Sequence, residues 1–123
     1  MNELGQIFNI VDRLEERKSN LSASAGTNLF SMTAVPAGEF WVLQGFSAVN
    51  VTNAVTSING YMTGASCDMA IAQTGATAVN IALKWTGALV MAPGDYVRFT
   101  FGGCTLNDDL YVDIWGYKMM YEK

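Results

Sequence analysis

Apolar residues follow two different periods along this chain, one near the N-terminus and another after residue 27. Over residues 3–18 they recur every three or four positions, with Asn2 placed to cap a helix and the basic residues Arg17 and Lys18 in its last turn. This spacing predicts an amphipathic helix. Its apolar stripe comprises Leu4, Ile7, Phe8, Val11 and Leu14.

The predicted helix is followed by residues 19–28, "SNLSASAGTN", a small polar stretch with the composition of a flexible linker. The chain is therefore expected to divide into a helical arm with its linker, residues 1–26, and a second domain, residues 27–123. A helix on such a linker can reach another chain, so we predict that its apolar stripe binds a partner. A helix folded back onto its own domain is the alternative.

From residue 27 onward apolar residues alternate with polar ones, which is the period of β-strands. Two runs near the C-terminus alternate most clearly, one through Val97, Phe99 and Phe101 and one through Leu110, Val112 and Ile114. Turn residues separate the runs, and Asn59-Gly60 is a candidate tight hairpin. Seven or eight such strands predict an all-β fold, an antiparallel β-sandwich.

The run at residues 40–48 is apolar on both sides, as a strand covered on both faces requires. One face carries Phe40, Val42, Phe46 and Ala48, and the other carries Trp41 and Leu43. A Pro-Ala-Gly turn precedes this run, and a similar turn ending in Gly94-Asp95 precedes residues 96–101. In such turns glycine permits a positive φ, and the acidic residue after it can accept hydrogen bonds from turn amides.

Charge is sparse and uneven, with a formal net charge of -4 and seven of the eighteen charged residues in the first eighteen positions. Basic residues cluster only at residues 13–18, which argues against a nucleic-acid partner held through phosphates. There is also no apolar run long enough to span a membrane and no secretory signal pattern at the N-terminus. The middle of the chain faces water through small uncharged polar side chains, typical of a surface covered by another protein or of a solvated sandwich.

The residue types argue against catalysis and against a bound cofactor. With no histidine, the Ser-His-Asp and Cys-His pairs of nucleophilic enzymes are excluded, and a zinc site lacks ligands. Cys67 and Cys104 favour two free thiols over a disulfide. Asp108, Asp109 and Asp113 suggest a weak calcium alternative, but no twelve-residue ligand loop accompanies them. We expect no catalytic residue, no metal and no cofactor.

The last strand carries aromatic residues on the face opposite its apolar one. These residues are Tyr111, Trp115 and Tyr117. Aromatic side chains are enriched at protein interfaces, so we predict that this face mediates self-association. A second layer of the same chain covering the three residues is the alternative.

Four motifs together resemble the small β-sandwich virion proteins of tailed bacteriophages, most closely the capsid decoration, or cement, proteins. They are the turn at residues 35–38, the aromatic strand at 40–43, the hydrophobe-x-Pro-Gly-Asp segment at 90–95 and the closing Trp-Gly-Tyr at 115–117. The resemblance covers roughly residues 27–118. These motifs describe turns and strands, so no catalytic residue is carried over.

The resemblance implies a jelly-roll-like homotrimer with N-terminal arms that reach neighbouring subunits. It implies a structural protein of the capsid exterior, made in the cytoplasm of the bacterial host, that stabilises the head by binding the major capsid protein. The acidic balance of the chain fits an exterior position. One alternative is a neck, tail or fibre component of the virion. Another is a carbohydrate-binding receptor module that stacks sugars on Trp41, Trp85 or Trp115.

Overall fold

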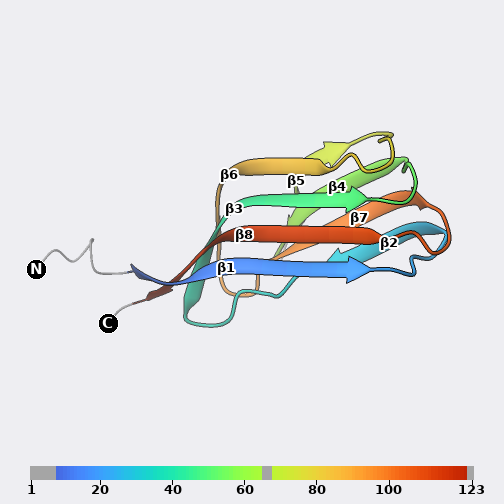
Figure 1. The fold of residues 1–123 in the computed structure, drawn as a ribbon. Coiled ribbons are helices and arrows are strands. Elements are labelled where there is room, and N and C mark those ends of the chain that lie inside the picture. The colour runs from blue at the N-terminus through green and yellow to red at the C-terminus, as the bar shows by residue number, and fades with distance from the viewer. Residues whose placement is uncertain (1–7, 65–67, 122–123) are drawn as a thin grey trace, which may run out of the picture.

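A computed structural model describes residues 8–64 and 68–121, and this part of the chain is built from strands without a helix (Figure 1). The eight strands are β1 (Phe8–Asn20), β2 (Gly26–Ser31), β3 (Glu39–Asn50), β4 (Ser57–Thr63), β5 (Asp68–Thr74), β6 (Leu83–Met91), β7 (Tyr96–Cys104) and β8 (Leu110–Tyr121). The all-β prediction is confirmed, and the strand count agrees with seven or eight.

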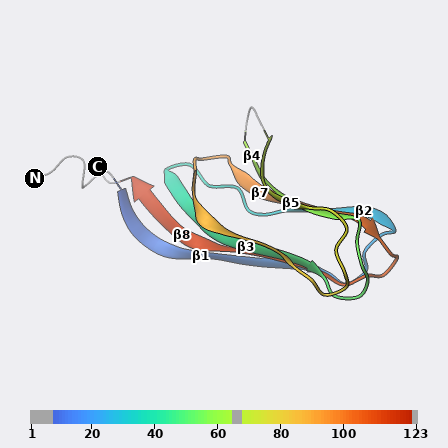
Figure 2. The same cartoon turned by 90° about the horizontal axis from the view of Figure 1, so that it is seen from above.

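The strands form two four-stranded antiparallel sheets packed face to face, as Figure 2 shows from above. The first sheet has the order β1-β8-β3-β6 and the second sheet has the order β2-β7-β4-β5. Only the β4–β5 connection stays within one sheet, and every other connection crosses from one sheet to the other. This is the strand order of a jelly roll, an antiparallel sandwich that brings the first and last strands together.

The predicted N-terminal helix is wrong over the described residues, because β1 is the edge strand of the first sheet. It pairs antiparallel with β8 from Phe8, opposite Tyr121, to Asn20, opposite Leu110. A single helix of this length is marginal in water, whereas pairing satisfies the free backbone edge of β8 and buries Leu14 at 2% exposure. Leu4 and Ile7 lie outside the described residues.

Charged side chains on β1 alternate between the two faces of the strand, and those facing inward close the edge of the sandwich. The carboxylate of Glu16 accepts hydrogen bonds from the Thr33 backbone N–H at 2.9 Å and from the Thr33 hydroxyl at 2.7 Å. Lys18 Nζ donates to the Ser31 carbonyl oxygen at 2.6 Å. Inward charges of this kind protect an edge strand from pairing with other chains.

The polar stretch after β1 is a short ordered connection rather than a flexible linker. Ala23 is fully buried, its N–H donates to the Asp108 carbonyl at 3.1 Å, and its carbonyl accepts from the Asn107 N–H at 2.8 Å. Residues 8–26 therefore belong to the sandwich and do not form an arm in front of it.

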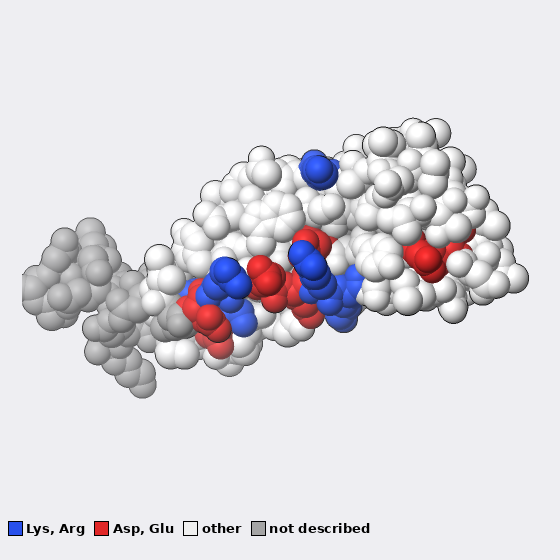
Figure 3. Space-filling view, in the orientation of Figure 1, with Lys and Arg blue, Asp and Glu red and all other residues white. Residues whose placement is uncertain are grey.

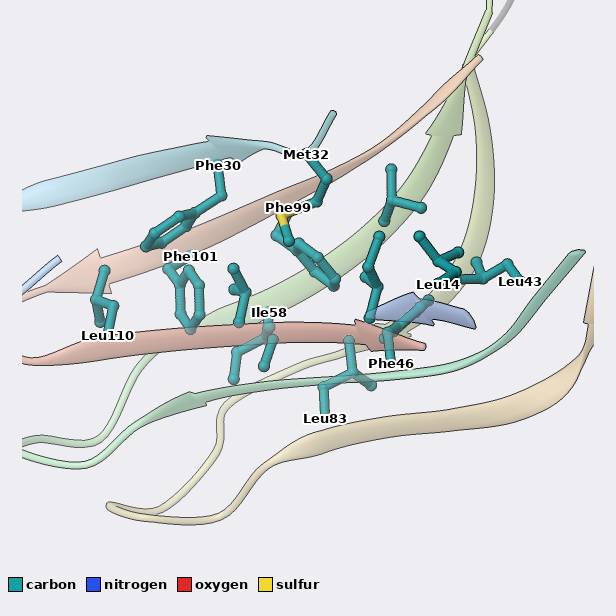
Figure 4. Close-up of a cluster of buried hydrophobic side chains, with 14 of the residues drawn as sticks. Leu14, Phe30, Met32, Leu43, Phe46, Ile58, Leu83, Phe99, Phe101 and Leu110 are labelled. Carbon is teal, nitrogen blue, oxygen red and sulfur yellow. The ribbon is translucent and has the colours of Figure 1, made fainter. Parts of the chain in front are cut away.

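The core lies between the sheets and is centred on phenylalanines from both of them (Figure 4). Phe46 of β3 meets Phe99 of β7 edge to face at 5.1 Å between ring centroids, and Phe30 meets Phe101 at 5.8 Å. The Phe46 ring also lies over Gly60, where a Cβ would come within 2.5 Å of its Cζ. Asn59-Gly60 is consequently an interior part of β4, and the predicted hairpin there is wrong.

A β-bulge in β3 changes which of its residues face the core. Trp41 and Leu43 point inward before Gln44, and Phe46 and Ala48 point inward after it, with the register shift between Leu43 and Gly45. The expected grouping of Phe40 and Val42 with Phe46 is therefore wrong. On β8, Gly116 lies against the bulge, where a Cβ would clash with the Val42 carbonyl oxygen.

The positive φ expected at the glycines of the two similar turns is confirmed, and the turns also bond to one another, although Glu39 of the first turn accepts from Trp41 Nε1–H and not from a turn amide. Gly38 and Gly94 have φ of 84° and 91°, and the Asp95 carboxylate accepts from the Ala92 N–H at 3.0 Å. The Val35 N–H donates to the Asp95 carbonyl at 2.9 Å, and the Gly94 N–H donates to the Val35 carbonyl at 2.8 Å. This pairing joins the β2–β3 and β6–β7 connections at one end of the sandwich.

Candidate binding surface on the first sheet

The outer face of the first sheet carries the aromatic residues that the sequence analysis singled out. Tyr111, Trp115 and Tyr117 project from β8 away from the core, while Leu110, Val112 and Ile114 on the same strand are buried. Tyr111 is 42% exposed, and Trp115 and Tyr117 are half-buried. Within the described residues the two sheets are the only layers, so no second layer covers these three side chains.

A row of polar residues crosses this face between two of the aromatic residues. Strand register places Arg17 of β1 beside Asp113 of β8, Asp113 beside Ser47 of β3, and Ser47 beside Lys84 of β6. Residues opposite one another in antiparallel strands point to the same side, so the four side chains share the outer face. Arg17 Nε lies 3.5 Å from Asp113 Oδ2 in an ion pair.

Next to the polar row, toward the chain termini, lies a second row of residues that contains Trp115, and its indole packs against Gly45. Register pairs Glu15 of β1 with Trp115, and Trp115 with Gly45 of β3. A Cβ at Gly45 would lie only 2.5 Å from Cε2 and 2.7 Å from Nε1 of the indole. The part of the indole formed by Nε1, Cε2 and Cζ2 therefore lies against Gly45, in space that a side chain there would fill.

The row on the other side contains Tyr111 between Ser19 of β1 and Val49 of β3. Between this row and the polar row the surface is hollowed into a shallow groove of about 370 Å³. Its walls include Arg17, Ser19, Ser47, Val49, Tyr111 and Asp113. Sequence reasoning found Tyr111 but missed Arg17 and Ser47 as its neighbours, because no local pattern reveals which strands pair.

Charge on this face is confined largely to one side, as Figure 3 shows in a space-filling view. Lys, Arg, Asp and Glu side chains gather in a band that follows β1, and most of the face over β8, β3 and β6 is uncharged. Arg17 is balanced by Asp113 within the band. The surface thus joins aromatic rings, a few fixed polar groups and nearly neutral surroundings.

Two of the three tryptophans considered as sugar platforms lie elsewhere. Trp41 is only 3% exposed and faces the core, with its Nε1–H donating to Glu39 at 2.9 Å. Trp85 is half-buried and stacks on Phe46 at 5.5 Å between ring centroids. Trp41 is therefore inaccessible to a sugar ring, and Trp115 is the tryptophan on the open face.

Of the acidic residues considered for calcium, Asp108 is held in a buried hydrogen-bond network. It is fully buried and accepts hydrogen bonds from Asn50 Nδ2 at 2.7 Å, from the Thr105 N–H at 2.8 Å and from Asn53 Nδ2. Burial raises the pKa of this carboxyl, but the three hydrogen bonds outweigh burial and hold the pKa below its usual value. Among residues 8–64 and 68–121 there is no cluster of His, Cys, Asp and Glu that could hold a metal ion.

Cys104 is a buried free thiol, in agreement with the preferred interpretation of the cysteines. Burial raises its pKa, a hydrogen bond with Asn28 lowers it, and the nearby Asp108 charge raises it again, with a net increase. Cys67 lies outside the described residues. In the described chain no helix is long and apolar enough to cross a membrane.

The fold and this surface define a jelly-roll β-sandwich with an open aromatic face. Compared with known proteins, the sequence matches no protein family and no curated protein. Among solved structures, the chain is similar to a Bacillus endospore appendage pilus protein at 7% identity, covering 90% of this chain and 89% of that one, with a TM-score of 0.44.

Two further similarities are equally distant. One is to the Drosophila NLP core, with 12% identity, coverage of 85% and 97%, and a TM-score of 0.41. The other is to infectious bursal disease virus (Gx strain), with 8% identity, a TM-score of 0.42, and coverage of 91% of this chain and 30% of that one. Such distant similarities carry no argument about function, which rests on the chain's own surface.

Proposed function

We propose that this protein is a structural protein of a phage virion that decorates the capsid by binding the major capsid protein. One feature of the structure carries the proposal. Strands β1 and β8 run toward both chain termini beyond the end of β6, which stops at Met91 opposite Trp41, while Trp41 is opposite Lys118 of β8 (Figures 1 and 2). Over Phe8–Ile10 and Met119–Tyr121 the pair forms a ribbon at the end of the first sheet, where β3 joins it with Phe40 opposite Met119 and Glu39 opposite Met120.

This β1–β8 ribbon presents apolar side chains on both of its faces. Ile10 is 69% exposed and Met120 is 46% exposed. Ile10 is opposite Met119 while Met120 is opposite Asn9, so Ile10 and Met120 lie on opposite faces. A ribbon that is apolar on both faces is suited to insertion between two neighbouring subunits.

Burial of these side chains contributes a modest binding free energy per copy, and the total grows when several symmetry-related copies bind the same capsid. Covering one large apolar side chain contributes about 1.5–3 kcal/mol. When several copies bind one lattice, each weak contact is reinforced by the others, which suits a cement protein. The resemblance to phage decoration proteins and the acidic balance of the chain support the same conclusion.

Removal of residues 1–20 cannot test attachment, because β1 is part of the sandwich. That truncation would leave β8 as an open edge and would remove the buried side chain of Leu14 from the core. The test therefore uses point variants, Ile10→Asp and Met120→Asp. Leu29→Asp is the matched control, because Leu29 is 62% exposed on the outer face of the second sheet.

The assay is cosedimentation of the purified protein with capsids of the virus that carries its gene. We expect wild type and Leu29→Asp to sediment with capsids, and both ribbon variants to stay in the supernatant while melting like wild type. Undiminished binding of both ribbon variants contradicts docking through the ribbon. Failure of the wild type to bind, together with its absence from purified virions, contradicts the decoration function itself.

The homotrimer and the self-association of Tyr111, Trp115 and Tyr117 remain predictions. Light scattering on a sizing column measures the mass, and three chains are expected. Trp115→Ala lowers that mass if the aromatic face joins the copies. An unchanged trimer places the interface elsewhere and leaves the aromatic face open.

A further inference from the structure

We propose that the outer face of the first sheet binds a neutral oligosaccharide across the groove and the polar row, with Tyr111 at the groove and Trp115 beyond the polar row as stacking platforms and the polar row between them as the hydrogen-bonding groups. This site goes beyond the proposed capsid attachment. It lies on the body of the sandwich, while attachment is assigned to the β1–β8 ribbon.

The spacing of the two aromatic residues fits a chain of sugars better than a single ring. Tyr111 and Trp115 are four residues apart on β8, on the same face as Asp113 midway between them. At about 3.4 Å per residue their Cα atoms are about 14 Å apart. A ligand that contacts both rings and the polar row must therefore be extended.

Gly45 prepares Trp115 to act as a platform. Because Gly45 has no side chain, the indole of Trp115 can lie against the sheet there, and Trp115 is half-buried on the outer face. A sugar ring has an apolar C–H face that packs on an aromatic ring such as this one. Tyr111 supplies a second and more exposed ring beside the groove.

The polar row offers the donors and acceptors that sugar hydroxyls require. The Asp113 carboxylate only accepts hydrogen bonds, the Arg17 guanidinium only donates, and the Ser47 hydroxyl does both. The ion pair at 3.5 Å holds Arg17 and Asp113 in place and balances their charges, and Lys18, which also lines the groove, donates to the Ser31 carbonyl oxygen. Lys84 adds one positive charge at the far end of the row, which is less than the cluster of basic groups that a phosphate-bearing ligand needs, so a neutral sugar chain is favoured.

The first test is a titration of tryptophan fluorescence with neutral oligosaccharides of three to six units. The panel comprises β-1,4-glucan, α-1,4-glucan, β-1,4-mannan and chitin fragments. We expect saturable binding of at least one member, with longer fragments binding more tightly than a monosaccharide. A folded protein that binds none of the panel overturns the proposal.

The second test uses variants against the oligosaccharide that binds, measured by calorimetry so that the readout does not depend on tryptophan. Trp115→Ala and Asp113→Asn are each expected to weaken binding about tenfold or more. Trp115→Phe keeps a stacking ring and should retain part of the affinity. Gly45→Ala keeps Trp115 but displaces its indole, so it should weaken binding as well.

Controls separate this site from other surfaces and from the proposed function. Tyr61→Ala removes an aromatic ring on the second sheet, and Ile10→Asp alters the ribbon; both should bind the oligosaccharide like wild type. Wild-type affinity in Trp115→Ala overturns the site. So does a stable oligomer that dissociates in Trp115→Ala and binds no oligosaccharide, because the face is then buried between copies.

Discussion

Asp108 ties three connections together at the end of the sandwich nearest Tyr111, two of them through its carboxylate, and its replacement by asparagine is the sharpest test of the fold. Its side chain accepts from Asn50 at the end of β3, from Asn53 after it and from the Thr105 N–H before β8. Its carbonyl accepts from Ala23 in the β1–β2 connection. Asp108→Asn keeps the size of the side chain but replaces one accepting oxygen with a donating NH₂.

The magnitude follows from the number of donors that face the carboxylate. An asparagine oxygen can replace one carboxylate oxygen, but its NH₂ then faces a donor, so at least one of three charge-assisted bonds is lost in a buried site. Each such bond contributes about 1.5–3 kcal/mol, and a facing donor adds a desolvation cost. We expect a loss of about 2–4 kcal/mol from a total that is typically about 5–15 kcal/mol.

The pH dependence of this loss has a definite sign. Hydrogen bonding outweighs burial and lowers the pKa of Asp108 in the folded state, so the unfolded chain takes up the proton first as the pH falls. The stabilisation by Asp108 is therefore complete above the unfolded pKa of about 3.9 and declines as the pH falls below it. The difference between wild type and Asp108→Asn should be constant from pH 7 to pH 5 and shrink below about pH 4.

Urea unfolding at several pH values measures both effects. The matched control is Asp109→Asn, because Asp109 forms its hydrogen bond to Thr52 through its backbone N–H at 3.0 Å, which the substitution leaves intact. A free energy of unfolding for Asp108→Asn within about 0.5 kcal/mol of the wild-type value at pH 7 would refute the reasoning, because a change that small is typical of a surface substitution. A difference that stays constant down to about pH 3, well below the unfolded pKa, would refute the linkage to this carboxyl.

Two further predictions concern the core. Gly60→Ala places a methyl group against the Phe46 ring and should destabilise the protein by about 1–3 kcal/mol. Gly75→Ala is the control and should leave the stability unchanged, because no atom lies within 4 Å of the added Cβ. Urea unfolding compares the two variants. Cys104, buried and with a raised pKa, should react with a thiol reagent at neutral pH far more slowly in the native protein than in denaturant. A Cys67→Ser background isolates its rate, and a fast native reaction would contradict its burial.

The sequence predicted best those strands whose alternation is unbroken. Val97, Phe99 and Phe101 of β7 are fully buried, and so is the matching face of β8. In each of these two strands, every second residue faces the core without interruption. The pairing of β7 with β4 has no register shift, and the pairing of β8 with β3 has none from Gly45 to Asn50. The outward direction of Tyr111, Trp115 and Tyr117 could be predicted for the same reason.

Prediction failed where a distant partner decides the local structure. Residues 8–18, the described part of the predicted helix, carry a helix-like spacing, yet they belong to a strand because β8, near the other end of the chain, offers an edge to pair with. The polar stretch after them is ordered because Ala23 bonds with residues 107 and 108. In β3, one extra residue at Gln44 reverses the two faces, and nothing in the local pattern marks that bulge.

The sequence by itself thus determined the all-β class, the two glycine turns and the two faces of the last strand, because backbone preference and alternation act over a few neighbouring residues. Tertiary structure alone decided that residues 8–20 form a strand, which residues of β3 face the core, and which side chains line the groove. The groove's polar row joins Arg17, Asp113 and Ser47, which are far apart in the chain. They meet only because cross-strand hydrogen bonding sets the register of β1, β8 and β3, and that register depends on the packing of the whole sandwich.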